Sequence, residues 1–291
     1  MPRWPRIDAP DLLARLALSD EEFRAALAAM AGSVGPRDFT EALYERAISY
    51  PWARPATSFL LDGHEVKALD DLAAGARAGL IAQETAGRHP LLAFGSNGSP
   101  EALILKFGHL VPEQRRLLVV AGELHDFDVG ASAHPTFYAA MPGTIFPSPG
   151  TRVRASVLWV TTEQFTALTW TEISYALGHV ETPFIAELDG APALDGVFGF
   201  VARLGAHRVD GEVVALAAVE ARGRTARALT QEQILDDVAR RAIGPGAVAR
   251  DLVERVMADF GGLAAVAGPM LHETAAAFAS DRWTPYPAAG G

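Results

Sequence analysis

The sequence predicts an α+β fold in which N-terminal and C-terminal helices flank a strand-rich middle region. Helical periodicity dominates residues 1–89 and returns in residues 227–291, whereas residues 90–226 contain short apolar stretches separated by Gly, Pro and Asp. The chain has no internal repeat and no low-complexity linker. We therefore expect the three regions to form one compact unit, with helices packed against a sheet or barrel.

The N-terminal region contains three stretches with helical periodicity, at residues 19–32, 36–48 and 69–83. The first begins with Ser19 and Glu22, which have the spacing of a capping box. No catalytic pattern occurs in this region. It is expected to be a helical extension.

The middle region contains several stretches rich in apolar, β-branched and aromatic residues. They predict strands at residues 91–95, 116–124, 151–160, 182–188, 196–204 and 212–221.

The C-terminal region predicts two further helices, at residues 229–244 and 247–267. Thr230 and Gln233 have the spacing of another capping box. The last stretch, residues 281–291, is expected to be a loose tail.

The composition argues against several classes of function. The net charge is -10 and no long run of Lys and Arg occurs, so we expect no nucleic-acid partner. The absence of Cys excludes disulfides and thiol nucleophiles. No signal-peptide pattern and no apolar run of about 18 residues are present, so we expect a cytoplasmic protein without a membrane partner.

The sequence predicts no metal cofactor. Its 8 histidines include no HxH or HExxH pair. The densest set of metal-capable side chains is Glu123, His125, Asp126 and Asp128. For that stretch a solvated loop is favoured over a ligand set.

A glycine-rich turn, FGSNGSPEAL at residues 94–103, joins a predicted strand to a predicted helix. Ser99 has the N-cap position, Pro100 the first helical position and Glu101 the first turn. Free backbone amides at such a junction favour an anion. Because the turn matches neither a P-loop nor a dinucleotide fingerprint, a carboxylate suits it better than a phosphate. Local chemistry alone also fits a plain turn.

A second candidate is a carboxylate on the apolar face of a helix predicted for residues 160–177. Thr161 and Gln164 have capping-box spacing. The apolar residues that share one face of this helix are Phe165, Leu168 and Ala176. Glu172 lies on the same face.

A carboxylate that faces the packed side of a helix is disfavoured in its charged form, so Glu172 needs a charged partner or a bound proton. Such a group suits general acid and base catalysis. Two alternatives remain: Glu172 pairs with an arginine or backbone amides for structural reasons, or the helix ends early and leaves it exposed.

Three motifs together resemble the γ-glutamylcyclotransferase-like family over about residues 90–220. They are the turn Phe94-Gly95-Ser96-Asn97, the strand start Ser148-Pro149-Gly150 with Val153, and the stretch with Leu168, Glu172 and Tyr175. Their order and spacing agree with the family pattern. The sequence departs from that pattern at Phe94, where the family has Tyr, at Gly98, where it has Leu, and at Ile173, where it has Gly.

The resemblance implies a small mixed β-barrel or sheet flanked by the N-terminal and C-terminal helices, and an enzyme without a cofactor. It implies that Glu172 is the catalytic acid and base. The substrate it implies is a γ-glutamyl or related amide, bound by Phe94, Gly95, Ser96, Asn97, Gly98 and Tyr175. In the family reaction the α-amino group attacks the side-chain amide carbonyl of the same molecule, which releases an amine and 5-oxoproline.

Two other functions stay open. The same fold can support amide hydrolysis or another acyl transfer, because fold does not fix reaction. It can also keep a pocket without turnover, as a binding or assembly protein. The helical extensions would then contact a partner, and a homodimer through these extensions is one such contact.

Overall fold

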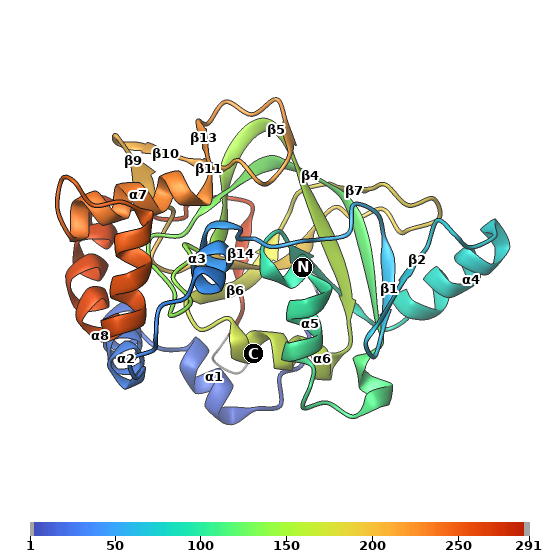
Figure 1. Ribbon diagram of the computed structural model, residues 1–291. Helices are drawn as coiled ribbons and strands as arrows, with labels where there is room; N and C mark the ends of the chain where they lie inside the picture. Colours follow the sequence, from blue (N-terminus) through green and yellow to red (C-terminus); the bar gives the residue numbers. More distant parts are fainter. Residues whose placement is uncertain (1–2, 288–291) are drawn as a thin grey trace.

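The computed structural model describes residues 3–287, which form an α+β fold around a large mixed sheet (Figure 1). The α-helices are α1 (Pro10–Leu16), α2 (Asp20–Ser33), α3 (Glu41–Ile48), α4 (Ala74–Thr85), α5 (Pro100–Lys106), α6 (Thr162–Thr171), α7 (Gln231–Ala242) and α8 (Ala249–Thr274). Short 3-10 helices are η1 (Ser96–Gly98) and η2 (Pro112–Arg115). The strands are β1 (Phe59–Asp62), β2 (Glu65–Ala68), β3 (His89–Ala93), β4 (Leu117–Ala131), β5 (Gly143–Val160), β6 (Tyr175–Val180), β7 (Phe184–Ala186), β8 (Val197–Ala202), β9 (Arg208–Val209), β10 (Glu212–Val213), β11 (Ala215–Leu216), β12 (Ala221–Arg222), β13 (Ala228–Leu229) and β14 (Trp283–Pro285).

The main sheet is mixed. Its strands pair in the order β13, β11, β4, β5, β3, β8, β6, β14. Most pairs are antiparallel, but β3 with β8 and β11 with β13 are parallel. The long strands β4 and β5 pair along most of their length and form the centre of the sheet. β9 and β10 form a separate two-stranded sheet.

The expected barrel is wrong, because the sheet does not close on itself within residues 3–287. Closure would join the outer edge of β6 to the outer edge of β4. The outer edge of β6 is paired with β14, and that of β4 with β1, β7 and β11. The backbone N–H and C=O groups on these outer edges already bind other strands, so they are not available to close a barrel.

Two apolar clusters pack against the sheet. Successive residues of β3 belong to different clusters, Leu91 to one and Leu92 to the other, as expected when side chains alternate between the faces of a strand. The cluster with Leu91 includes buried residues of α1, α5 and α6, and the cluster with Leu92 includes those of α3, α7 and α8. Residues of all three sequence regions thus share the core.

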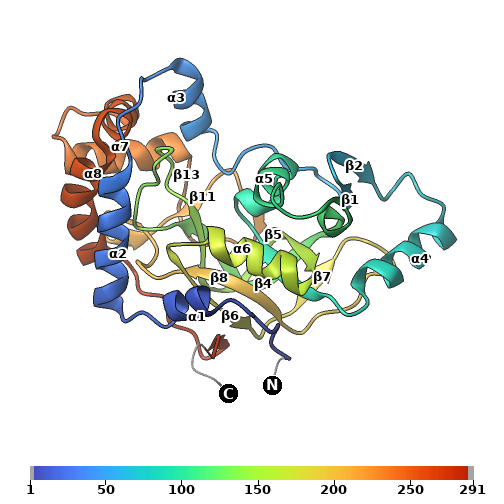
Figure 2. The ribbon, with the colours of Figure 1, turned by 90° about the horizontal axis from the view of Figure 1, so that it is seen from below.

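The helices lie in distinct places around the sheet. α2, α7 and α8 gather at one end of the molecule, where α8 packs against both other helices, and α4 lies at the opposite end (Figures 1 and 2). α5 and α6 are neighbours between these ends. The candidate site is built where α5 and α6 meet.

Most predicted elements are present. α2, α3, α4, α7 and α8 overlap the helices predicted for the terminal regions, and every predicted strand overlaps an observed one. All three capping boxes form: Ser19 with Glu22, Thr161 with Gln164, and Thr230 with Gln233. The stretch 212–221 is divided among β10, β11 and the start of β12.

The helix predicted for residues 160–177 is wrong in its second half. α6 ends at Thr171, and β6 begins at Tyr175. Ala176, expected on the helical stripe, pairs with Val201 of β8 in a six-residue antiparallel ladder. Strand pairing therefore overrides the helical periodicity of this segment.

Three further expectations are corrected. Residues 59–68, within the region predicted to be helical, form the hairpin of β1 and β2. Residues 123–128, favoured as a solvated loop, lie in β4. Residues 283–285 of the expected loose tail form β14, which is anchored because the Trp283 ring lies against Gly178. Residues 288–291 lie outside the described residues.

Candidate active site

Glu172 lies directly after α6 and caps the C-terminal end of that helix. Its backbone N–H donates to the carbonyls of Leu168 and Thr169 over 3.2 and 3.3 Å. Its side chain is 12% exposed. The helix therefore ends early, as in one alternative from the sequence, but the carboxylate stays largely buried.

The Glu172 carboxylate is anchored through one oxygen. Asn97 Nδ2 donates to Oε1 over 3.0 Å, and Lys106 Nζ donates to the same oxygen over 2.8 Å. Lys106 Nζ also donates to Asn97 Oδ1 over 2.7 Å, so the three side chains form a closed triangle. Within residues 3–287, Oε2 of Glu172 accepts no hydrogen bond. The charged partner that a buried carboxylate requires is thus the Lys106 ammonium, and not an arginine.

Asn97 belongs to η1, the tight turn that follows β3. The Gly98 N–H donates to the Gly95 carbonyl over 3.0 Å, and the Ser99 N–H donates to the Ser96 carbonyl over 2.9 Å. The Ser99 side chain makes no capping hydrogen bond, and α5 is only 7 residues long. Two of the amides expected to hold an anion are therefore already bonded within the turn.

Residues of the N-terminal region cover this turn. A Cβ atom placed on Gly95 would lie 2.5 Å from the Tyr50 hydroxyl oxygen, and one placed on Gly98 would lie 3.0 Å from Arg54 Cδ. Among residues 94–98, Ser96 alone is partly exposed. A ligand that reaches the site in this conformation meets Ser96 and the Glu172 carboxylate, and not the backbone of the two glycines.

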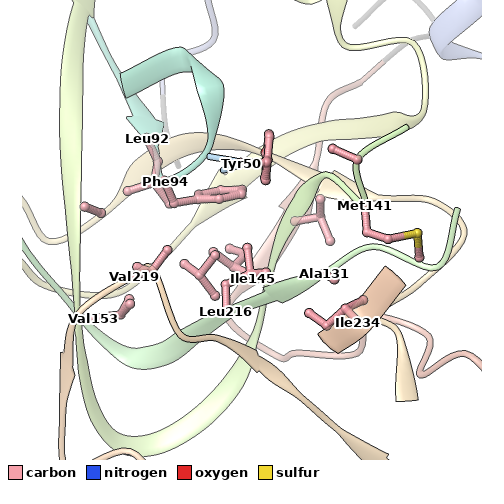
Figure 3. Packing of buried hydrophobic residues seen from close by; sticks show 14 of the residues in the cluster. Tyr50, Leu92, Phe94, Ala131, Met141, Ile145, Val153, Leu216, Val219 and Ile234 are labelled. Atoms are coloured by element: carbon pink, nitrogen blue, oxygen red, sulfur yellow. The ribbon is translucent and has the colours of Figure 1, made fainter. Parts of the chain in front are cut away.

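The Phe94 side chain, expected to bind substrate, packs in the core. It is 6% exposed, and Figure 3 shows its ring pointing toward Tyr50 above Ile145 and Leu216. The family pattern has a tyrosine at this position. In this chain the hydroxyl beside the turn is that of Tyr50.

Two tyrosine hydroxyls bind the backbone of Gly143. The Gly143 N–H donates to the Tyr50 hydroxyl over 2.8 Å, and the Tyr175 hydroxyl donates to the Gly143 carbonyl over 2.7 Å. Burial raises the pKa of Tyr50 to about 12, and the Glu172 carboxylate adds to this increase. Burial also raises the pKa of Tyr175 and of Tyr138, again with a contribution from Glu172. The three hydroxyls stay protonated at neutral pH, within electrostatic reach of Glu172.

The structure brings together most of the predicted site residues but not all of the motifs. Asn97, Glu172 and Tyr175 lie around one site, whereas Ser148-Pro149-Gly150 lies in an irregular part of β5 opposite Asp126. The Asp126 carboxylate accepts a hydrogen bond from the Gly150 N–H over 2.9 Å. That motif shapes the β4–β5 pair rather than the site.

Sequence reasoning missed three residues of the site: Tyr50, Arg54 and Lys106. Tyr50 and Arg54 belong to no motif and reach the turn only through the fold. Lys106 is one of two lysines in the chain and lies in the last turn of the helix that follows the glycine-rich turn. That position was the one available signal for it.

The acidic side chains of β4 are paired with arginines. Asp128 binds Arg224 through two hydrogen bonds of 2.7 and 2.8 Å, and Asp126 binds Arg282 over 2.7 Å. Within residues 3–287, no group of three or more His, Cys, Asp or Glu side chains is placed to hold a metal ion.

The chain matches no protein-family model, and no curated protein matches it significantly. In the part of the chain that the structure describes, no helix combines the length and apolar character needed to cross a membrane.

Proposed function

We propose that this protein is a γ-glutamylcyclotransferase-like enzyme in which Glu172 is the general acid and base. One observation carries the proposal. Asn97 and Lys106 fix Glu172 through Oε1, and Oε2 has no hydrogen-bond donor within residues 3–287. A carboxylate held in this way keeps its orientation and has one oxygen left to exchange a proton with a ligand. The resemblance supports the same assignment, because Asn97 and Glu172 belong to two of its three motifs.

The proposed reaction is an intramolecular aminolysis. Glu172 takes a proton from the α-ammonium group of a γ-glutamyl amide, and the freed amine forms a bond to the carbon of the side-chain amide carbonyl. The bond between that carbon and the leaving nitrogen then breaks. In total two protons leave the attacking nitrogen and both reach the leaving nitrogen, so Glu172 carries them one at a time and ends ionised. The products are 5-oxoproline and the ammonium form of the released amine.

An intramolecular reaction requires only two things of the protein. Because nucleophile and carbonyl belong to one molecule, the site has only to fold the substrate into an attack geometry and supply the proton carrier. The balance of the reaction includes no water and no cofactor. Glu172 meets the second requirement through its unpaired oxygen.

A second candidate function is non-catalytic binding. The observation that favours it is the cover over the turn, since the Tyr50 hydroxyl and the Arg54 side chain occupy the space beside Gly95 and Gly98. A protein of this kind would bind a small carboxylate or amide without turnover. Amide hydrolysis has no observation of its own in its favour, and its product distinguishes it.

Incubation of the protein with a panel of γ-glutamyl amides, followed by mass spectrometry, tests the proposal. We expect 5-oxoproline and free amine in equal amounts with the wild type, and formation of both about 100-fold slower or more with Glu172→Gln. Glutamate in place of 5-oxoproline would indicate hydrolysis. No product from any member of the panel would contradict the enzymatic proposal and favour the binding protein.

A further inference from the structure

Arg54 is bound to the outer side of the turn that carries Asn97. Its Nη1 donates to the Phe94 carbonyl over 2.8 Å, and its Nη2 lies 3.4 Å from the Ala218 carbonyl. Its Cδ lies close to Gly98. The guanidinium group and the Glu172 carboxylate are therefore both bonded to residues 94–98, the first at the Phe94 carbonyl and the second at the Asn97 side chain.

In the part of the chain that the structure describes, the guanidinium group has no carboxylate partner. Both of its acceptors are neutral carbonyls, and no Asp or Glu within residues 3–287 lies at ion-pair distance from it. Glu220 acts on it only from a longer distance. Burial lowers the pKa of Arg54, as expected for a cation that has lost water without gaining an anion.

The guanidinium group still has hydrogen-bonding capacity. Arginine has five N–H donors, of which the carbonyls of Phe94 and Ala218 use two. None of the Arg54 nitrogens is among the buried atoms that lack a partner in the described chain. The Arg54 residue is itself partly exposed, and three of its N–H groups are not used by these two carbonyls.

The segment that carries Arg54 is held rigidly. Tyr50 is 3% exposed and accepts a hydrogen bond from Gly143. The Trp52 ring packs edge-on to Tyr50 at 5.5 Å between centroids, and the Arg46 guanidinium lies over Trp52 at 4.2 Å. Arg54 is thus positioned before any ligand arrives, which lowers the entropic cost of binding.

We propose that Arg54 is a specificity residue that binds a free carboxylate on the acyl part of the ligand. On the proposed function, this restricts the substrates to amides whose acyl group carries a carboxylate next to the attacking amine. Guanidinium and carboxylate are complementary in shape and charge, since two parallel N–H groups can bind both oxygens. The N-terminal region, which has no counterpart in the resemblance, would then supply part of the substrate site.

Binding measurements test this inference independently of turnover. Calorimetry with 5-oxoproline, and with 2-pyrrolidinone as the same lactam without the carboxylate, compares the wild type with Arg54→Met. We expect the affinity for 5-oxoproline to fall by about 10-fold to 100-fold, on the scale of charge-assisted hydrogen bonds. The affinity for 2-pyrrolidinone should not change. Arg54→Lys should restore part of the loss, because it keeps the charge but not the planar pair of donors.

Arg115→Met is the matched control. Arg115 also binds two backbone carbonyls, those of Leu110 and Gly108, each over 2.7 Å. Arg115→Met therefore removes a similar number of hydrogen bonds to the backbone, and none of them involves residues 94–98. We expect it to leave the affinity for 5-oxoproline unchanged. If Arg54→Met does not fold, Arg54→Lys takes its place, with an expected loss of several-fold.

The inference and the proposed function fail in different ways. If Arg54→Met weakens 5-oxoproline binding while no amide is turned over, Arg54 is a carboxylate-binding residue and the enzymatic proposal is wrong. 4-Aminobutyryl ethylamide is the analogue of γ-glutamyl ethylamide without the carboxylate. If the wild type converts γ-glutamyl ethylamide, but Arg54→Met has the same ratio of kcat/KM for the two amides as the wild type, the enzymatic proposal is supported and the inference is wrong. Failure of the wild type to bind 5-oxoproline, or an equal loss in Arg115→Met, also overturns the inference.

Discussion

Lys106 donates to Glu172 Oε1 over 2.8 Å, and this ion pair joins the last turn of α5 to the residue that directly follows α6. Both side chains are less than one-fifth exposed. The pair therefore contributes to stability as well as orienting the carboxylate. Both contributions can be measured on the same variants.

Glu172→Gln keeps the size and hydrogen-bonding capacity of the side chain but removes the proton carrier. We expect turnover of a γ-glutamyl amide to fall by about 100-fold or more, the usual scale for loss of a general acid or base. The free energy of unfolding should fall by about 1 to 3 kcal/mol, because Lys106 loses a charged acceptor. Activity assays and urea denaturation check the two effects. Glu163→Gln, an exposed carboxylate in the first turn of α6, is the control and should change neither.

The double variant that combines Glu172→Gln with Lys106→Met separates the effect on catalysis from the effect on stability. If Glu172 and Lys106 stabilise each other, the two stability losses should not add, and the double-mutant cycle should give a coupling of about 1 to 3 kcal/mol. A Glu172→Gln variant that retains full turnover and loses only stability would show that Glu172 is structural. The cyclotransferase proposal would then lose its main support.

Gly95→Ala tests the contact between the turn and Tyr50. A methyl group at this position would lie 2.5 Å from the Tyr50 hydroxyl, so we expect a loss of about 1 to 3 kcal/mol, typical of overpacking in a core. In the Tyr50→Phe background the obstructing oxygen is absent, and the same change should cost clearly less. Backbone strain at Gly95 cancels in this comparison because it is the same in both backgrounds. Equal losses in the two backgrounds would show that Tyr50 does not limit the space at the turn.

The parts of the fold that could be predicted from the sequence are those with local signals, such as capping boxes and apolar stretches. Ser19 with Glu22 and Thr230 with Gln233 are local signals, and each marks the start of an observed helix. β6 was missed because residues 172–177 continue the helical periodicity of α6. Its strand conformation depends on pairing with β8, which is more than 15 residues away in the chain and leaves no local signal.

The candidate site shows the same difference between residues with local signals and residues placed by long-range packing. Asn97 and Glu172 were found because each belongs to a short motif, and the structure places their side chains 3.0 Å apart. Tyr50 and Arg54 reach the turn from a region about 40 residues upstream that has no recognisable pattern. Long-range packing of this kind cannot be derived from periodicity or spacing.

The ion pair between Asp128 and Arg224 should be important for stability. Asp128 is fully buried and binds Arg224 through both carboxylate oxygens. Asp128→Asn leaves the guanidinium without its counterion, and we expect a loss of about 3 to 5 kcal/mol in the free energy of unfolding. Asp210→Asn is the matched control, because Asp210 is 80% exposed in its pair with Arg227 and should cost less than about 1 kcal/mol. Similar losses from the two variants would contradict this assignment.

A homodimer through the helical extensions is tested by light scattering. α2 and α8 pack against each other and still expose apolar side chains, with Met30 at 42% and Val266 at 58%. We expect twice the chain mass for the wild type and a single chain mass for Val266→Asp. A wild type that elutes with the mass of one chain would exclude this dimer under the conditions used.

Stability should fall as the pH is lowered from 7 toward 4, because His134 is partly buried and favoured in its neutral form. Burial lowers the pKa of His134 from 6.5 to about 4, and its Nδ1 is 2.9 Å from the Ser132 hydroxyl. Between these two values the unfolded chain binds a proton that the folded chain does not. The contribution of His134 is therefore complete above about pH 6.5 and is lost as the pH falls through the folded value, with a slope of up to about 1.4 kcal/mol per pH unit.

Urea denaturation at pH 7, 6 and 5 checks this slope. Burial also lowers the pKa of His89 and His179, so these residues add to the slope in the same direction. His134→Gln removes the titrating group, and we expect its free energy of unfolding to depend less on pH than that of the wild type. His64→Gln, a change on the exposed turn between β1 and β2, is the control and should keep the wild-type slope. If His134→Gln and the wild type lose stability in parallel between pH 7 and 5, His134 is not the group that titrates.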